Sequence, residues 1–140
     1  MNQKIRDRLE NAAIHGSAFS KDPGWFFVFV ENPEIRKEMY ELLGAENEPE
    51  DLILVFAKGN DWPGHLDACG AVYRMKEAAN EAGYDLELHK LTIFFHNPAS
   101  AAIRRAFGVP EGQECVGAFL LKEKECENRE VRWNVFSSIQ

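Results

Sequence analysis

Short apolar runs along this chain alternate with longer segments in which apolar and polar residues mix. Trp25–Val30 and residues 52–57 are continuous apolar runs, which is typical of strands covered on both faces. We expect Trp25–Val30 to lie in the middle of a sheet. Two more strands are predicted at Leu91–Phe95 and at residues 114–121, because both segments are rich in aromatic and β-branched residues.

Three segments with helical spacing flank these strands. The pattern predicts a charged helix over Gln3–Ile14 and a second helix over residues 33–43, with Asn32 as its N-cap and a proline at its first position. A short helix is expected over residues 99–107, where an asparagine and a proline repeat the same signal. The helices therefore separate the strands along most of the chain.

The longest amphipathic segment covers residues 66–82. Its apolar residues recur at close to helical spacing, so we expect a buried stripe that includes Leu66, Tyr73 and Met75. Alanines keep its other faces narrow. We expect a core helix, and the alternative is that part of its small-residue surface meets a second copy of the chain. Asp67 is placed in the first turn, opposite the positive helix end, and the proline–glycine pair before it in a loop.

The order of strands and helices predicts one domain over residues 1–140, with helices on both faces of a central sheet. Residues 129–140 form a C-terminal strand or extension, because apolar and polar residues alternate there. A charged linker precedes this strand, so it is free to leave its own subunit.

Charge and cysteine content narrow the function classes. A formal charge of -7 and a pI near 5.1 argue against nucleic acid and anionic membranes as partners. Cys69, Cys115 and Cys126 are too widely spaced for a metal knuckle, and their odd number favours a reducing cytoplasm. No signal peptide is expected because residues 1–10 are charged instead of apolar, and no membrane span is expected because no apolar run approaches about 20 residues. The four histidines lack metal-ligand spacing, so no metal site is predicted.

Several segments, in this order, resemble the flavin-dependent nitroreductases. They are residues 25–34, the strand 52–57, the helix 67–83 and, above all, residues 102–119, which read AIRRAFGVPEGQECVGAF. The resemblance covers about residues 9–125. It implies an α+β nitroreductase-like fold with a central mixed β-sheet. It also implies a homodimer with FMN at the subunit interface and a C-terminal strand exchanged between the subunits.

The resemblance implies a cofactor site made of an early polar loop and late basic side chains. The residues that we predict to bind the cofactor are Ser17, Ser20, Asp22, Lys122, Arg129 and Arg132. Ser20 and Asp22 stand where the family has amides that donate to the flavin carbonyls. Ionised Asp22 can only accept hydrogen bonds and repels an electron-rich reduced ring. No catalytic residue is predicted.

Two motifs of the family are altered here. Its opening pair of arginines, followed by a serine and another arginine, has no counterpart in Lys4, Arg6 and Arg8. Its glycine-rich turn reads GYDLE at residues 83–87 and keeps only the first glycine. Two functions stay open. One is an FMN-dependent oxidoreductase that uses NAD(P)H to reduce a small-molecule acceptor, a nitro compound or a quinone. The other is a non-catalytic protein of this fold that binds another ligand or a partner subunit.

Overall fold

The computed structural model describes residues 2–15, 19, 24–48 and 50–124. Its helices are α1 (Gln3–Ile14), α2 (Pro33–Leu42), α3 (Trp62–Glu81), α4 (Leu91–Phe95) and α5 (Ala101–Ala106), with a 3₁₀ turn, η1 (Pro98–Ser100). Its strands are β1 (Trp25–Val30), β2 (Asp51–Lys58), β3 (Tyr84–Leu88) and β4 (Gln113–Glu123). They form one sheet in the order β1-β2-β4-β3. The predicted C-terminal strand lies outside the described residues.

The described sheet differs from the expected one in two ways. All pairings between its strands are antiparallel, so this part of the sheet is not mixed. The β1 strand lies at an edge of the described sheet and not in its middle, and most of its side chains are only half buried. A continuous apolar run indicates that both faces of a strand are covered, but it does not reveal whether a second strand lies on each side.

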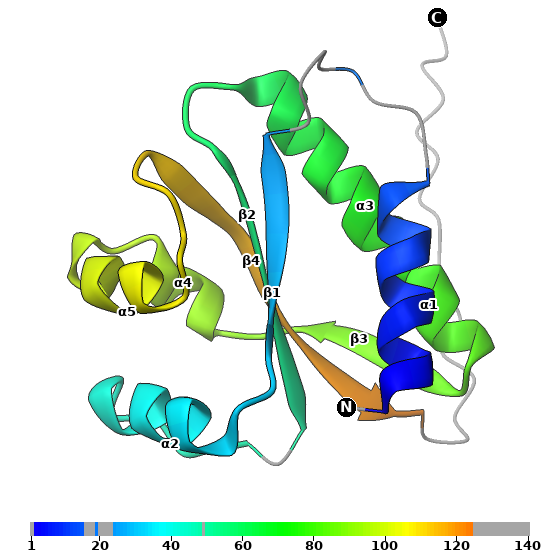
Figure 1. Cartoon of the computed structure of the whole chain (residues 1–140), viewed down its shortest axis with the longest axis horizontal. Helices are drawn as coiled ribbons and strands as arrows, with labels where there is room; N and C mark the ends of the chain where they lie inside the picture. The colour runs from blue at the N-terminus through cyan, green and yellow to red at the C-terminus, as the bar shows by residue number, and fades with distance from the viewer. Residues whose placement is uncertain (1, 16–18, 20–23, 49, 125–140) are drawn as a thin grey trace, which may run out of the picture.

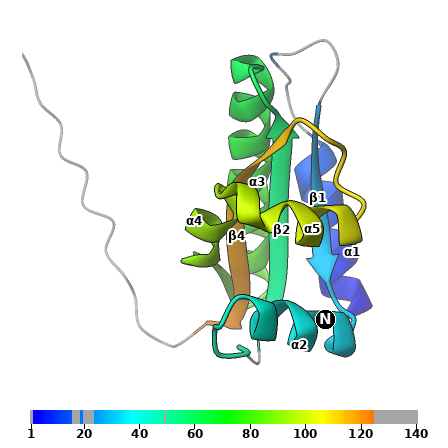
Figure 2. The same ribbon diagram turned by 90° about the vertical axis from the view of Figure 1, so that its left-hand side faces the viewer.

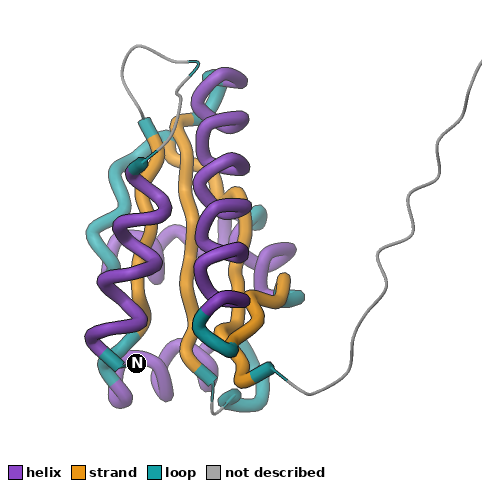
Figure 3. The backbone as a smooth tube through the Cα atoms, turned by 90° about the vertical axis from the view of Figure 1, so that its right-hand side faces the viewer, coloured by secondary structure: helices purple, strands orange, loops and turns teal. Residues whose placement is uncertain are grey.

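Helices cover both faces of the sheet (Figure 1), as the sequence predicts. The α1 and α3 helices lie side by side on one face (Figure 3), and α2, α4 and α5 lie on the other (Figure 2). The β2 strand supplies buried side chains to both layers, because alternate residues of a strand point to opposite faces. The predicted helix-covered architecture is thus confirmed.

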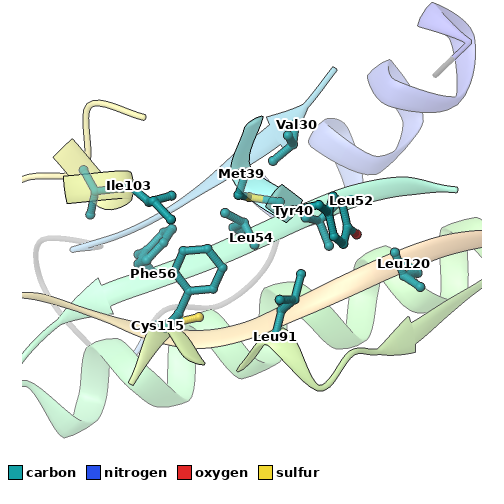
Figure 4. Packing of buried hydrophobic residues seen from close by; sticks show 13 residues of the cluster. Val30, Met39, Tyr40, Leu52, Leu54, Phe56, Leu91, Ile103, Cys115 and Leu120 are labelled. Atoms are coloured by element: carbon teal, nitrogen blue, oxygen red, sulfur yellow. The ribbon is translucent and has the colours of Figure 1, made fainter. Parts of the chain in front are cut away.

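The layer formed by α2, α4 and α5 encloses the larger side chains. Phe56 of β2 meets Phe95 of α4 edge to face, with ring centroids 6.2 Å apart. Met39 and Tyr40 of α2 are buried against the same cluster, and Leu91 closes it from α4 (Figure 4). This core holds α4, and therefore the end of β3, in place against the sheet.

The α3 helix begins four residues earlier than expected, at Trp62. The Asp61 carboxylate caps it by accepting a hydrogen bond from the Gly64 backbone N–H at 3.2 Å. Pro63 lies in the first turn, where a missing N–H costs nothing. The predicted loop at Pro63 and Gly64 is therefore wrong.

The buried face of α3 also differs from the prediction. Ala68, Ala71 and Ala79 are 0–1% exposed and pack, with Met75, in the core between α1, α3 and β2. These small residues therefore face the helix's own sheet, as expected of a core helix. Leu66 and Tyr73, which we expected inside, point outward. Met75 and Ala79 of the expected stripe are buried. Small side chains let a helix approach a sheet closely, so apolar spacing alone does not reveal which of the other residues face it.

The segment that follows α3 departs furthest from the structure that the sequence predicts. Residues Leu91–Phe95 form a helix instead of a strand, since Leu91 and Phe95 are one turn apart and both are buried. The strand is β3, in which Leu86 is buried and its charged neighbours are more exposed. Of residues 83–87, which align with the family's glycine-rich turn, only Gly83 lies in a turn, with a φ of 86°. The other four residues belong to β3.

The remaining predicted elements are confirmed with small changes of length. The α1 helix has the predicted bounds, and α2 ends at Leu42, shortly before Gly44 with its φ of 61°. The β2 and β4 strands are slightly longer than expected. The helix predicted over residues 99–107 is the η1 turn followed by α5.

Candidate functional site

The outer face of α3 carries large apolar side chains in the open. Trp62, Leu66 and Tyr73 are 73%, 47% and 63% exposed, and Cys69 between them is also exposed. They lie at successive turns of the helix, so they form one stripe. We call these four residues the α3 stripe. A contiguous apolar surface of this kind marks an interaction site more often than a solvated face.

A β-bulge in β4 brings further apolar residues to the same side of the sheet. Val55 pairs with Gly117 and Phe56 with Cys115, so Val116 has no residue opposite it. Cys115 and Ala118 both face the α2 layer, whereas Val116 and Phe119 pack with the α3 layer. The bulge therefore turns both Val116 and Gly117 toward α3.

The Phe119 ring lies across Gly117 at this bulge. A Cβ placed on Gly117 would stand 2.6 Å from Phe119 Cζ and 3.4 Å from Leu88 Cδ1. Leu88 pairs with Phe119 at the end of β3 and is 62% exposed. We call Leu88, Val116 and Phe119 the β3–β4 platform. It offers a surface of one aromatic ring and two aliphatic side chains, which suits the face of a planar ligand.

Ion pairs surround the outer part of β3. The Lys122 ammonium lies 3.4 Å from the Glu87 carboxylate. Lys76 of α3 lies 3.1 Å from Asp85 and also donates to the Leu86 carbonyl at 3.0 Å. Lys122, predicted to reach a phosphate, therefore has a carboxylate neighbour in the structure. Both pairs are largely exposed and contribute little to stability.

The other predicted cofactor residues do not enter the described structure. Ser17, Ser20, Asp22, Arg129 and Arg132 lie outside the described residues. Within the predicted flavin loop, residues 16–23, only Phe19 is described. The structure thus describes only Lys122 of the six predicted residues. It stays a prediction that the six residues form one site.

Asp67 ties the predicted flavin loop to α3. Its carboxylate accepts a hydrogen bond from the Phe19 backbone N–H at 2.6 Å, and Asp67 is only 4% exposed. The prediction that Asp67 stands in the first turn, opposite the helix end, is wrong because α3 begins at Trp62. The buried carboxylate therefore bonds a residue that is distant in the sequence, and it does not lie at the start of the helix.

The histidines are dispersed, and each contacts a different group of the chain. His65 lies 3.6 Å from Glu114, and His96 Nε2 lies 2.8 Å from the Cys115 carbonyl oxygen. His15 lies 2.8 Å from the Asn11 carbonyl oxygen. Among the residues that the structure describes, no cluster of three or more histidine, cysteine or acidic side chains could hold a metal ion.

A separate surface hollow, of about 550 Å³, lies along α1. It is lined by Lys4, Asp7, Arg8, Glu10, Asn11 and Ile14. All six residues belong to one helix, and their side chains are mostly charged and solvated. The hollow shares no residue with the β3–β4 platform, and the platform has the better ligand chemistry because it is apolar and lies beside a β-bulge.

The comparisons with known proteins agree on the fold. No protein-family model and no curated protein sequence matches the chain. A nitroreductase with bound FMN from Desulfitobacterium hafniense matches with a TM-score of 0.76 and 14% identity, over 100% of this chain and 88% of that one. A nitroreductase with bound FMN from Bacteroides fragilis has a TM-score of 0.71 and 17% identity, with the same two coverages.

A third structure is longer than this chain. The NfrA1 nitroreductase from B. subtilis matches with a TM-score of 0.74 and 14% identity. The match covers 94% of this chain but only 62% of that one. The predicted resemblance is confirmed at the level of architecture, and the chain has the nitroreductase fold.

Proposed function

We propose that this protein is an FMN-dependent oxidoreductase of the nitroreductase type that works as a homodimer in the cytoplasm. The observations that carry the proposal are two apolar surfaces, the exposed α3 stripe and the β3–β4 platform with its exposed Leu88. The fold supports it, because two solved nitroreductases of this fold hold FMN. These apolar residues are exposed in a single chain because, in this proposal, a flat cofactor and a second subunit cover them.

Two features support a second copy of this chain as the protein partner. The first is the α3 stripe, whose large side chains have no cover among the described residues. The second is β1, which has a described neighbour on one side only. A strand from residues 129–139 of the partner copy would complete that edge by adding a ladder of backbone hydrogen bonds.

The platform fits the ring of FMN better than the described surface fits its phosphate. Leu88 and Phe119 offer apolar atoms to a flat ring. Lys122, the described cation among the predicted residues, lies beside Glu87 and would have to exchange this partner for the phosphate. We therefore assign the phosphate to Arg129 and Arg132 together with Lys122, and the carbonyls of the ring to the hydroxyls of Ser17 and Ser20. Asp22 fits least well, because a carboxylate repels an electron-rich ring.

Bound FMN would supply the two-electron chemistry that links a reduced nicotinamide to a nitro compound or a quinone. The chain's own residues bind and orient the ring and exclude water from it. Leu88, Phe119 and the α3 stripe of the partner copy would enclose it, which strengthens every electrostatic contact made there. The acceptor is proposed only as a small molecule of these two classes.

The charges beside the platform favour a second candidate function. Asp85 and Glu87 lie on β3 and neutralise Lys76 and Lys122. A site whose cations are already paired with carboxylates suits a neutral ligand better than a phosphate ester. The second candidate is therefore a non-catalytic protein of this fold that binds another flat ligand or a partner subunit.

Turnover separates the two candidates. In the absence of oxygen, purified protein supplied with FMN is expected to oxidise NADH or NADPH only when a quinone or a nitroaromatic compound is added, because dioxygen also accepts electrons from a reduced flavin. Leu88→Glu should lower this activity, because a carboxylate enters the platform. Ile93→Glu is the matched control, since Ile93 is 77% exposed on α4 and outside the platform. FMN binding without turnover by the wild-type protein would favour the second candidate.

A further inference from the structure

The β3–β4 ladder ends in an unusual way beside the platform. Leu88 and Phe119 form its last strand pair, and the His89 backbone N–H still donates to the Ala118 carbonyl at 2.7 Å. In an antiparallel pair of this type, the Ala118 N–H would donate to the His89 carbonyl in return. It does not, because the chain turns into α4 after His89.

The Thr92 hydroxyl stands between the two groups that would otherwise bond. It accepts a hydrogen bond from the Ala118 N–H at 2.9 Å and donates to the His89 carbonyl at 2.8 Å. The side chain of Thr92 thus replaces one strand hydrogen bond by two. Ala118 is 0% exposed, so its N–H would otherwise lack a protein partner and be shielded from water.

The bonded peptide is the one that carries the platform. Ala118 lies between Gly117, across which the Phe119 ring rests, and Phe119 itself. On the facing segment, His89 directly follows Leu88. The His89 ring also supports the turn, since its Nδ1 accepts a hydrogen bond from the Leu91 N–H at 3.1 Å. Thr92 therefore joins the two backbones at the point where the Leu88 and Phe119 side chains of the platform emerge.

We propose that Thr92 is a positioning residue for the flavin ring, acting through the backbone that carries Leu88 and Phe119. This inference rests on the proposed function. Thr92 fixes the spacing of β3 and β4 at their last pair, and that spacing sets the distance between the aliphatic and aromatic parts of the platform. Without the Thr92 hydroxyl, the Ala118 N–H must find another hydrogen-bond acceptor, and the end of the β3–β4 ladder opens or shifts.

The test compares FMN affinity in hydroxyl variants of the full chain. Thr92→Val keeps the shape but removes the hydroxyl, and it should weaken FMN binding about tenfold or more. Thr92→Ser should restore binding, because serine keeps the donor and the acceptor. Ser100→Ala is the matched control: Ser100 is buried, and its hydroxyl donates to the Asn97 carbonyl at 2.8 Å, within the segment that joins α4 to η1.

Two further readouts separate positioning from stability. The visible absorption and circular dichroism of bound FMN report the surroundings of its ring, and Thr92→Val should change both while Ser100→Ala does not. If Thr92→Val fails to fold, Thr92→Cys replaces it, because a thiol is a weak donor and acceptor of similar size to serine. The expected order of affinity is threonine and serine first and cysteine below them.

Each outcome decides one claim. If the wild-type protein does not bind FMN, the proposed function is overturned. If it binds and Thr92→Val, or its cysteine substitute, binds equally well with an unchanged flavin spectrum, the role of Thr92 is overturned and the proposed function stands. Equal losses in Thr92→Val and Ser100→Ala, or no rescue by Thr92→Ser, also overturn the role of Thr92.

Discussion

The Phe119 ring rests on Gly117, two residues earlier in the same strand, and only a glycine leaves room for it. A Cβ at Gly117 would stand 2.6 Å from Cζ and 2.7 Å from Cε2 of the ring. Gly117 has no left-handed backbone angle, so space and not conformation requires the glycine. Glycine inside a strand often marks a close approach of this kind.

Replacement of Gly117 by alanine should displace the Phe119 ring without unfolding the protein. We expect a loss of about 1–3 kcal/mol of unfolding free energy from overpacking. FMN affinity should fall in parallel, since the ring leaves the platform. Urea unfolding and near-ultraviolet circular dichroism measure the two structural effects. Gly70→Ala is the control, because its Cβ would meet only Arg74 Nη1 at 3.4 Å. An unchanged aromatic spectrum in Gly117→Ala would contradict the described packing.

Disruption of the α3 stripe should dissociate the proposed dimer. Leu66→Glu places a charge at the centre of the stripe, where burial against a partner would remove its hydration. Light scattering or sedimentation should then show a monomer where the wild-type protein is a dimer. Leu42→Glu makes the same change at a 68% exposed position of α2 and should remain dimeric. A dimer that survives Leu66→Glu would place the interface elsewhere.

Arg74 links α3 to the end of α1, and its loss should separate these helices. Its Nε and Nη2 donate to the carbonyls of Ala12 and Ala13, both at 3.1 Å. These are charge-assisted bonds at a helix C-terminus, where a cation is also favoured. Arg74→Ala should cost about 1.5–3 kcal/mol of unfolding free energy.

The matched control for Arg74 is Arg8→Ala. Arg8 lies 3.4 Å from Glu81 in a largely exposed pair, so its loss should cost less than about 1 kcal/mol. Thermal and denaturant unfolding give both values. Equal costs in the two variants would show that the contacts of Arg74 with α1 add nothing.

The two described cysteines should differ sharply in reactivity. Burial raises the pKa of the Cys115 thiol from 9.0 to about 12, so it is protonated at pH 8 and inert to alkylation. Cys69 is exposed in a single chain, so it should be labelled once Leu66→Glu has dissociated the proposed dimer and be protected in the wild-type dimer. Iodoacetamide labelling followed by peptide mass analysis measures each site. Fast modification of Cys115 at pH 8 in the folded protein would contradict its burial.

The same pKa gives a pH dependence for stability. A thiol whose pKa is raised by folding favours the folded state while it is protonated, below about pH 9. As the pH rises from 9 toward 12, the unfolded chain releases the proton first, so unfolding becomes easier. Stability measured across this range should fall less in Cys115→Ala, once its lower starting value is subtracted.

Much of the fold follows from local sequence signals. Asn32 and Pro33 fix the start of α2 because capping and proline chemistry act within a few residues. The face of α3 could not be read in the same way. Alanines and large apolar residues both have helical spacing there, and only the closeness of the sheet decides that Ala68 and Ala71 turn inward. Periodicity gives the existence of this helix but not its orientation.

The β3–β4 platform depends on contacts between strands, which the pattern of apolar and polar residues along the chain does not reveal. Val116 and Phe119 share a face only because of the bulge, and Leu88 joins them from a strand that the sequence placed elsewhere. Gly117 is the one local signal, since glycine within an apolar strand favours a bulge or a close approach. The six residues predicted from the family resemblance remain a prediction, apart from the position of Lys122.

The measurement that tests the central claim most directly is an FMN titration of the purified wild-type chain. Quenching of flavin fluorescence and the visible spectrum of the complex give the affinity and the surroundings of the ring. We predict saturable binding with a Kd of about 1 μM or tighter, which corresponds to about 8 kcal/mol of binding free energy. Absence of saturable binding up to about 1 mM FMN, a limit of about 4 kcal/mol, would contradict the proposed function.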